Sequence, residues 1–119
     1  MTSNAARVLA HPAREEIRVE SVLHALSDPI RLRIVRQLAH DADELACSRF
    51  DLPVSASTST HHFRVLRESG VIQQFYRGTA KLSGLRTQDL DDLFPGLLAS
   101  VLGAADLQEK RLGGALQQA

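Results

Sequence analysis

The spacing of apolar residues changes at Gly70, and this change constrains the fold more than any other feature of the chain. From about Ala56 to Ser69 the sequence has helical spacing, with Ser55 suited to cap its start and Gly70 its end. After Gly70, the segments VIQQFY and AKLSGL have the pattern of short strands joined by RGT, with Gly78 at the tip of the turn. We therefore predict a helix followed directly by a β-hairpin.

Two helices are predicted ahead of this helix and hairpin. The first has an apolar face at helical spacing, made of Val19, Val22, Leu23 and Leu26. The second begins at Pro29, with Asp28 as its N-cap, and runs to about His40. Its buried stripe is expected at Ile30, Ile34, Val35 and Leu38. The side chains expected to project elsewhere are Arg31, Arg33, Arg36 and Gln37.

A short third helix is expected from about Asp43 to Arg49, before Pro53 interrupts helical structure. Beyond the hairpin, helical segments follow, with a break where Pro95 succeeds Phe94. The predicted fold class is mainly α with a small β-hairpin (α+β). A short helix, a tight turn, a second helix and a hairpin together form the winged helix-turn-helix arrangement.

The chain length of 119 residues suits a single domain with a modest core. Residues 1–15 are short of large apolar side chains, so we expect a flexible N-terminal arm. Residues 16–111 form the predicted domain, and residues 112–119 a frayed tail. A single cysteine, and no apolar run near the roughly 20 residues of a membrane span, predict a cytoplasmic protein with no membrane partner.

The helix before Gly70 has faces of contrasting chemistry. At about 100° per residue, the side that faces the core carries Ser59, Phe63 and Leu66. The opposite side carries Ser57, His61, Arg64 and Glu68. Thr60 and Arg67 lie on one flank, and His62 lies on the other flank, nearer the core. Hydroxyl, imidazole and guanidinium groups in this position suit phosphate oxygens and base edges in a DNA major groove.

The formal net charge is zero, but the charges are unevenly placed along the chain. Residues 56–86 contain one acid, Glu68, against a basic set of Arg64, Arg67, Arg77, Lys81 and Arg86. Residues 87–110 contain one base, Lys110, against an acidic set of Asp89, Asp91, Asp92, Asp106 and Glu109. A basic segment that coincides with a helix and hairpin is typical of contact with nucleic acid.

Three stretches carry a family resemblance: LSDPIRLRIVRQLA, SASTSTHHFRVLRESGVI and the hairpin YRGTAKL. Over about residues 17–110 the chain resembles the ArsR-type family of bacterial winged-helix transcriptional regulators. The most specific parts are the Asp28-Pro29 helix start and the spacing of residues from Thr60 to Gly70. The resemblance implies a homodimer through the first and last helices, with the helix before Gly70 in the DNA major groove.

Carried over by position, the resemblance assigns Ser57, Thr60, His61 and Arg64 to the groove, and Arg77 and Lys81 to the wing. Ala56 stands where relatives often have lysine, which removes a phosphate contact, and Ser59 replaces an apolar residue inside the helix. The full set of predicted DNA-binding residues is Ser55, Ser57, Thr58, Thr60, His61, Arg64, Arg67, Arg77 and Lys81.

The apolar stripe of the last helix is longer than one small core requires. We predict that it forms a dimer interface with the first helix, made of Val19, Val22, Leu23, Leu93, Leu97, Leu98, Val101 and Leu102. The alternative is packing of the last helix against the first within one chain. Two-fold symmetry would place two recognition helices about 34 Å apart, which suits a palindromic operator.

Metal-sensing members of the family use a Cys-x-Cys pair, or His and carboxylate ligands on the last helix, and both patterns fail in this chain. Ala46 and Ser48 stand at the positions of the cysteine pair, and the single Cys47 between them is not a chelating pair. No histidine follows His62, so the last helix supplies only carboxylates. His61 and His62 lie about 100° apart on a helix, so they do not converge on one ion. His11 is left as a weak candidate ligand. No cofactor is predicted, and a metal or small-molecule effector stays open.

Cys47 is interpreted as a buried apolar residue, with a reactive redox thiol as the alternative.

Together the patterns predict a homodimeric, sequence-specific regulator that binds double-stranded DNA. We expect a repressor, because so short a chain leaves no room for a separate activation domain. The alternatives are a winged-helix module that binds a protein, and a regulator that senses metal through a nonstandard site. An enzyme is not expected, because the chain has no His-Glu-x-x-His helix, glycine-rich phosphate loop or Gly-x-Ser-x-Gly turn.

Overall fold

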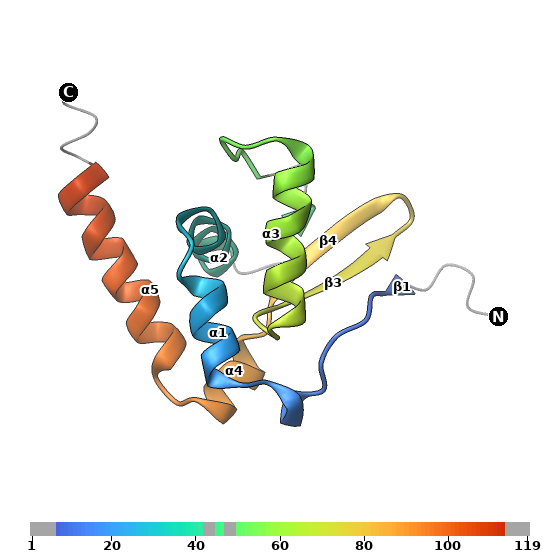
Figure 1. Cartoon of the computed structure of the whole chain (residues 1–119), viewed down its shortest axis with the longest axis horizontal. Coiled ribbons are helices and arrows are strands. Elements are labelled where there is room, and N and C mark those ends of the chain that lie inside the picture. Colours follow the sequence, from blue (N-terminus) through green and yellow to red (C-terminus); the bar gives the residue numbers. More distant parts are fainter. Residues whose placement is uncertain (1–6, 42–44, 47–49, 114–119) are drawn as a thin grey trace. The chain divides into compact units, whose positions relative to one another are not determined.

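The computed structural model describes residues 7–41, 45–46 and 50–113. The chain forms two compact units, residues 1–86 and 87–119. The first contains the helices α1, α2 and α3 and the strands β1 to β4, and the second contains α4 and α5 (Figure 1).

The first helices of the chain begin and end as their sequence predicts. Helix α1 spans Val19–Leu26 and α2 spans Pro29–Asp41. The Asp28 Oδ1 atom accepts hydrogen bonds from the backbone N–H groups of Ile30, at 2.8 Å, and Arg31, at 3.1 Å. Asp28 therefore satisfies N–H groups that the first turn of α2 would otherwise leave unpaired.

Helix α3 spans Ala56–Glu68, and its ends are also capped as predicted. The Ser55 side chain accepts a hydrogen bond from the Thr58 backbone N–H. Gly70 follows with a φ of +87°, a left-handed conformation that side chains rarely adopt. A Cβ atom at this position would lie 2.6 Å from the Ile17 Cγ1 atom, so both the backbone and the packing require glycine.

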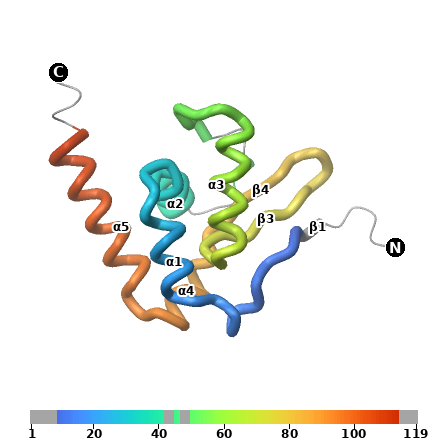
Figure 2. Tube along the Cα trace, in the orientation of Figure 1, coloured from blue at the N-terminus to red at the C-terminus, as the bar shows by residue number. Residues whose placement is uncertain are grey.

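The predicted hairpin is confirmed and forms the centre of a larger sheet. Strands β3 (Ile72–Arg77) and β4 (Ala80–Leu85) are antiparallel and join through a turn in which Gly78 has a φ of +63°. The two-residue strands β1 (Arg7–Val8) and β2 (Leu45–Ala46) flank them, in the order β1-β3-β4-β2. Figure 2 shows the β1 segment beside the hairpin of β3 and β4. The sheet therefore includes segments that the sequence analysis did not assign to strands.

The prediction of a third helix from Asp43 to Arg49 is wrong for the two residues of this segment that the structure describes, Leu45 and Ala46. Leu45 and Ala46 are extended and pair with Ser83 and Leu82 of β4. A helix so short lacks enough internal hydrogen bonds to offset its nucleation cost, whereas an unpaired β4 edge offers partners at once. The rest of that expected helix, and Cys47 with it, lies outside the described residues.

The predicted free arm also differs from the structure. Arg7 and Val8 pair with Tyr76 and Phe75 of β3, and the chain continues along the sheet to a 3-10 helix at Arg14–Glu16. The Arg86 NH1 group donates to the Pro12 carbonyl at 3.0 Å. Backbone pairing, which needs no large apolar side chain, fixes a segment whose composition indicated disorder. Residues 1–6 lie outside the described residues.

The core of the first unit combines residues from its helices and from the start of the sheet. Its most buried large side chains include Val22, Ile34, Val35, Leu66, Val71 and Ile72. Phe63 of α3 packs edge-on against Phe50, with ring centroids 5.2 Å apart. The Gly70 turn places the C-terminal end of α3 beside the start of β3, so helix and hairpin share this core (Figure 1).

The second unit contains the helical segments predicted after the hairpin. Helix α4 spans Thr87–Leu93 and α5 spans Leu97–Gln108, with the break at Pro95 and Gly96 as predicted. A π-helical turn at Glu109–Gly113 continues α5, and the rest of the expected tail lies outside the described residues. Within the described part of the chain, no helix is both long and apolar enough to span a membrane.

Candidate nucleic-acid interface

The side of α3 that faces away from the core, its outward face, carries exposed polar side chains. Ser57, His61 and Arg64 are exposed, as the helical spacing predicts. The Arg64 side chain is exposed, so its guanidinium is accessible to an anion. Together these side chains offer hydroxyl, imidazole and guanidinium groups at successive turns of one helix.

The hydroxyl groups near the start of α3 are partly occupied within the helix. Ser55 Oγ donates to Thr58 Oγ1 at 3.0 Å, and lies 3.3 Å from Ser57 Oγ. Thr60 Oγ1 donates to the Ala56 carbonyl at 3.0 Å. Each of these hydroxyl oxygens can still accept a hydrogen bond. The residues that carry them were all predicted to contact DNA: Ser55, Ser57, Thr58 and Thr60. The exposed Ser55, Thr58 and Thr60 therefore suit contact with hydrogen-bond donors.

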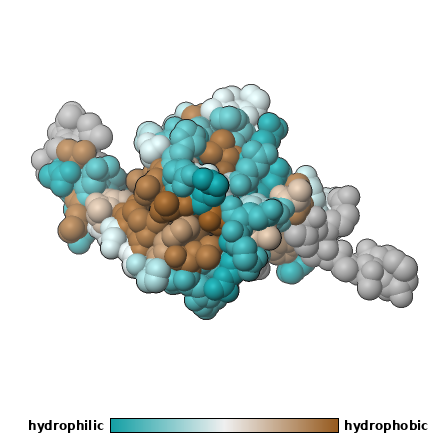
Figure 3. Space-filling view, turned by 60° about the horizontal axis from the view of Figure 1, so that its bottom comes forward, coloured by the Kyte–Doolittle hydropathy of each residue, from teal (hydrophilic) through white to brown (hydrophobic). Residues whose placement is uncertain are grey.

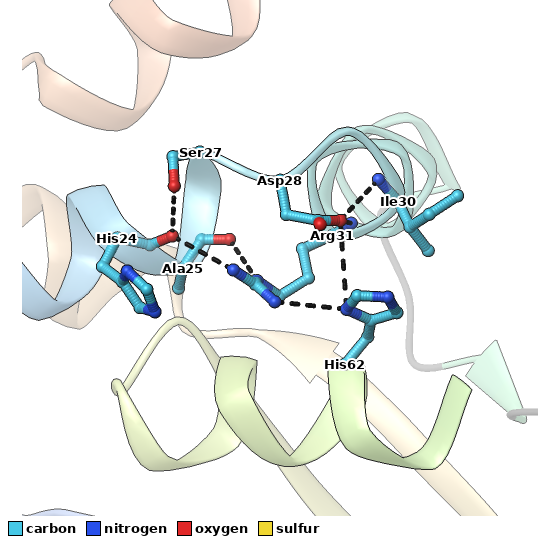
Figure 4. A network of polar contacts seen from close by, with 7 residues as sticks. All are labelled: His24, Ala25, Ser27, Asp28, Ile30, Arg31 and His62. Atoms are coloured by element: carbon cyan, nitrogen blue, oxygen red, sulfur yellow. Dashed lines mark hydrogen bonds and ion pairs between the residues drawn. The ribbon is translucent and has the colours of Figure 1, made fainter. Parts of the chain in front are cut away.

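His62 belongs to a buried network that links α3 to the first helices (Figure 4). The side chain is 8% exposed, and its Nδ1 atom lies 3.2 Å from Arg31 NH1. Arg31 donates from Nε to the Ala25 carbonyl at 2.8 Å and from NH2 to the His24 carbonyl at 3.3 Å. Because arginine has only donors, His62 Nδ1 is the acceptor and the ring proton lies on Nε2. The prediction of a semi-buried, hydrogen-bonded His62 is confirmed.

Asp28 completes the network from the start of α2. Its Oδ1 atom lies 3.9 Å from His62 Nδ1. Burial acts to raise the pKa of Asp28, but the hydrogen bonds from the Arg31 and Ile30 backbone N–H groups, with the charge of Arg31, outweigh it and lower that pKa. The carboxylate therefore stays ionised beside the cationic Arg31, which compensates for the burial of that charge.

Arg31 is a site residue that the sequence analysis missed. Its place outside the apolar stripe of α2 predicted a side chain directed away from the core, but it is 7% exposed. The helix start at Asp28-Pro29 was a usable signal, because an arginine one turn later reaches the carbonyls at the end of α1.

Arg67, a predicted DNA contact on the flank of α3, is directed toward the sheet. Its NH1 group donates to Gln74 Oε1 at 2.7 Å, and its Nε atom is buried without a hydrogen-bond partner in the described part of the chain. Gln74 is 0% exposed and was not singled out from the sequence. Its neighbour Gln73 is exposed, and only the alternation of a strand distinguishes these identical residues.

The hairpin places both predicted wing cations over aromatic rings of β3. The Arg77 guanidinium carbon lies 5.4 Å from the centre of the Phe75 ring, and Lys81 Nζ lies 5.8 Å from the centre of the Tyr76 ring. Arg77 is exposed beside the turn, and Lys81 is half-buried. A ring attracts a cation over its face, so these contacts favour positions in which the positive charge lies on the hairpin that follows α3.

His11, the weak candidate for a metal ligand, is attached to the sheet. Its Nε2 atom accepts a hydrogen bond from the Gln74 backbone N–H at 2.8 Å. Burial is the main cause that lowers the pKa of His11; a hydrogen bond with the Leu9 backbone opposes it, and the charges of Arg86 and Arg67 add to the lowering. Among the described residues, no group of three or more His, Cys, Asp or Glu side chains is arranged to bind a metal ion.

The predicted dimer residues differ in exposure. On α1, Val22 is 1% exposed and belongs to the core, while Val19 and Leu23 are 40% and 47% exposed. In the second unit, Leu98 is buried, and the half-buried residues are Leu93, Leu97, Val101 and Leu102. Val19 and Leu23 are therefore the predicted dimer residues that are most accessible to a second copy of the chain.

Comparison with known proteins places the chain among transcriptional regulators. Residues 26–74 match the model of a helix-turn-helix domain. The chain is 30% identical over 89 residues to the uncharacterized HTH-type transcriptional regulator YceK of Bacillus subtilis (strain 168), covering 73% of this chain and 88% of the relative. A crystal structure of an ArsR family transcriptional regulator shares the fold, with a TM-score of 0.53 and 16% identity, over 88% of this chain and 97% of that chain. The chain thus belongs to the HTH-type transcriptional regulators, and it shares the fold of an ArsR family regulator, the family that its motifs resemble.

Proposed function

We propose that the chain is a repressor that binds a palindromic operator as a homodimer and acts in the cytoplasm. The observation that carries the proposal is the outward face of α3, where Ser57, His61 and Arg64 are exposed next to a hairpin that holds Arg77 and Lys81. Donors and acceptors on one helix suit base edges in a major groove, and the hairpin cations suit the flanking phosphates.

The proposed contacts divide into those that select bases and those that hold phosphates. Base selection is assigned to the outward face of α3, where each side chain can form directional hydrogen bonds, and to one exposed residue on its flank. The outward residues are Ser57, His61 and Arg64, and the flanking residue is Thr60. Arg77 and Lys81 on the hairpin contact phosphates, because their positive charges attract the phosphate oxygens. Phosphate contacts supply affinity for every sequence, and base contacts supply the preference among sequences.

The proposed dimer forms through the terminal helices. Val19 and Leu23 are large apolar side chains that α1 leaves 40% and 47% exposed. Figure 3 shows hydrophobic residues gathered on the surface of the face it displays, bordered by hydrophilic ones. Burial of such side chains against a symmetry mate stabilises association at roughly 25 cal/mol per Å². Occupation of the operator by the dimer would block a promoter, which is why we propose repression.

DNA binding is tested by fluorescence anisotropy. Duplexes that the purified chain prefers are first selected from a random-sequence pool, and binding to the best duplex is compared with binding to a scrambled one at several salt concentrations. We expect a preference of about a thousandfold and a steep fall of affinity with salt. Binding that is blind to sequence or insensitive to salt would refute the proposal and favour a protein partner.

Dimer formation is tested by sedimentation equilibrium. Leu23→Glu places a charge at an exposed apolar position of α1 and is expected to shift the chain to a monomer. Ala39→Glu adds the same charge at an exposed position of α2 and is expected to leave the dimer intact. A wild-type chain that sediments as a monomer at every concentration would contradict the proposed assembly.

A further inference from the structure

Gln74 has a fully buried side-chain amide at the junction of α3 and the hairpin. The residue is 0% exposed, and so is its partner Ser83. Its Oε1 atom accepts a hydrogen bond from Arg67 NH1 at 2.7 Å, and its Nε2 atom donates to Ser83 Oγ at 3.0 Å. A buried amide is costly without such bonds, and an arginine donor determines which end of the amide is oxygen. The orientation of this side chain is therefore fixed by its partners.

The partners of Gln74 lie on different elements. Arg67 is in the last turn of α3, and Ser83 is on β4, directly opposite Gln74 on the neighbouring strand. The Gln74 backbone N–H donates to His11 Nε2 at 2.8 Å, and its carbonyl accepts from the Leu9 N–H at 3.2 Å. One residue of β3 thus joins the helix, the hairpin and the segment that precedes α1.

A small tilt of α3 at this junction has a large effect at its other end. Ser57 lies ten residues from Arg67, which corresponds to about 15 Å along the helix axis. A tilt of about 6° at Arg67 would move Ser57 by about 1.6 Å, well beyond the roughly 0.5 Å range of a good hydrogen bond. The hairpin cations would stay in place. Base contacts would be lost while phosphate contacts remained.

We propose that Gln74 is a positioning residue for sequence recognition, which fixes the orientation of α3 relative to the β3–β4 hairpin through its bond to Arg67. This inference rests on the proposed DNA-binding function. It assigns Arg67 to the junction, and removes it from the residues that contact DNA. The role of both residues is then to make base contacts and phosphate contacts possible at the same time.

The test is a double-mutant cycle with a matched control. Gln74→Met and Arg67→Met, alone and together, remove the bond while keeping side chains of similar length. Gln73→Met changes the same residue type at the neighbouring, exposed position of β3. Affinity for the selected duplex and for a scrambled duplex is measured by anisotropy, across a salt series and at a temperature below the unfolding transition of every variant.

Gln74→Met is expected to lower the preference for the selected duplex about tenfold, which is the loss of a misplaced base contact. Affinity for scrambled DNA should stay within about twofold, because phosphate contacts tolerate a small tilt. Simple destabilisation would instead lower both affinities together. The double variant should lose no more than either single variant, since both remove the same bond. Gln73→Met should match the wild type.

Three results would overturn the inference while leaving the proposed function intact. The first is a Gln74→Met variant with the wild-type preference. The second is losses from Gln74→Met and Arg67→Met that add. The third is a fall of about one in the salt slope of Arg67→Met, which would show that Arg67 contacts a phosphate. A wild-type chain with no preference among duplexes would overturn the proposed function, and this inference with it.

Discussion

The outward and inward sides of α3 use similar residues for different purposes. His61 and Arg64 are exposed on the outward side, whereas His62 is 8% exposed and Arg67 is bonded to a buried glutamine. The neighbouring histidines therefore have different roles: His61 faces the proposed DNA, and His62 contacts Arg31. Residue type alone does not indicate which polar groups contact a partner and which hold the helix in place.

The largest expected effect comes from a substitution in the buried network on the inward side of α3. Arg31→Met leaves the Ala25 carbonyl and the His62 ring without their donor, while the His24 carbonyl keeps its hydrogen bonds from Ser27. Because the Ala25 and His62 acceptors stay buried, we expect the free energy of unfolding to fall by about 2–4 kcal/mol. Chemical denaturation followed by circular dichroism measures the change.

Arg33→Met is the matched control, since Arg33 is exposed on the same helix. Its effect should stay within about 0.5 kcal/mol. Equal stability changes in the two variants would show that the buried network does not hold α3 against the first helices.

A smaller effect is expected on the outward side. Arg64→Ala should leave the free energy of unfolding within about 0.5 kcal/mol, because the side chain is exposed. Affinity for the selected duplex should fall about tenfold, the lower part of the range for a lost base contact. Anisotropy measures this loss, and Arg33→Ala removes the same charge from α2 as a control. A fall in stability without a loss of affinity would reverse the assignment of the two sides.

The smallest effect concerns the attachment of the N-terminal segment to β3. His11 accepts a hydrogen bond from Gln74, and its pKa is lowered in the folded chain, so the unfolded chain binds a proton more readily. Its contribution to stability is complete above about pH 6.5 and is lost as the pH falls toward the lowered pKa.

His11→Gln removes this titration. Between about pH 7.5 and 5, the variant should lose slightly less stability than the wild type in parallel urea titrations. Identical pH dependence in both chains would show that His11 is not tied to the sheet in the folded state.

The sequence predicts the ends of α2 and α3 well because local chemistry determines them. Asp28 and Ser55 are capping residues, and Gly70 has the conformation that glycine favours. The hairpin follows in the same way from strand alternation and a glycine at the turn. Such features depend on residues close together in the chain.

Other features depend on residues far apart in the chain, and the sequence analysis missed them. Strands β1 and β2 have two residues each and exist because the edges of β3 and β4 offer backbone partners. Arg31 is buried because the end of α1 leaves carbonyls within its reach. Gln74 differs from Gln73 only in the side of the sheet that it faces.

The most direct test of the account compares the base preferences of His61→Ala and His62→Ala with those of the wild type, by selection from one random-sequence pool. We predict that His61→Ala changes which bases are preferred and keeps the wild-type stability. We predict that His62→Ala lowers stability and affinity for all duplexes, with the same preferred bases. A His61→Ala variant that selects the wild-type sequence would contradict the proposal that the outward face of α3 recognises DNA.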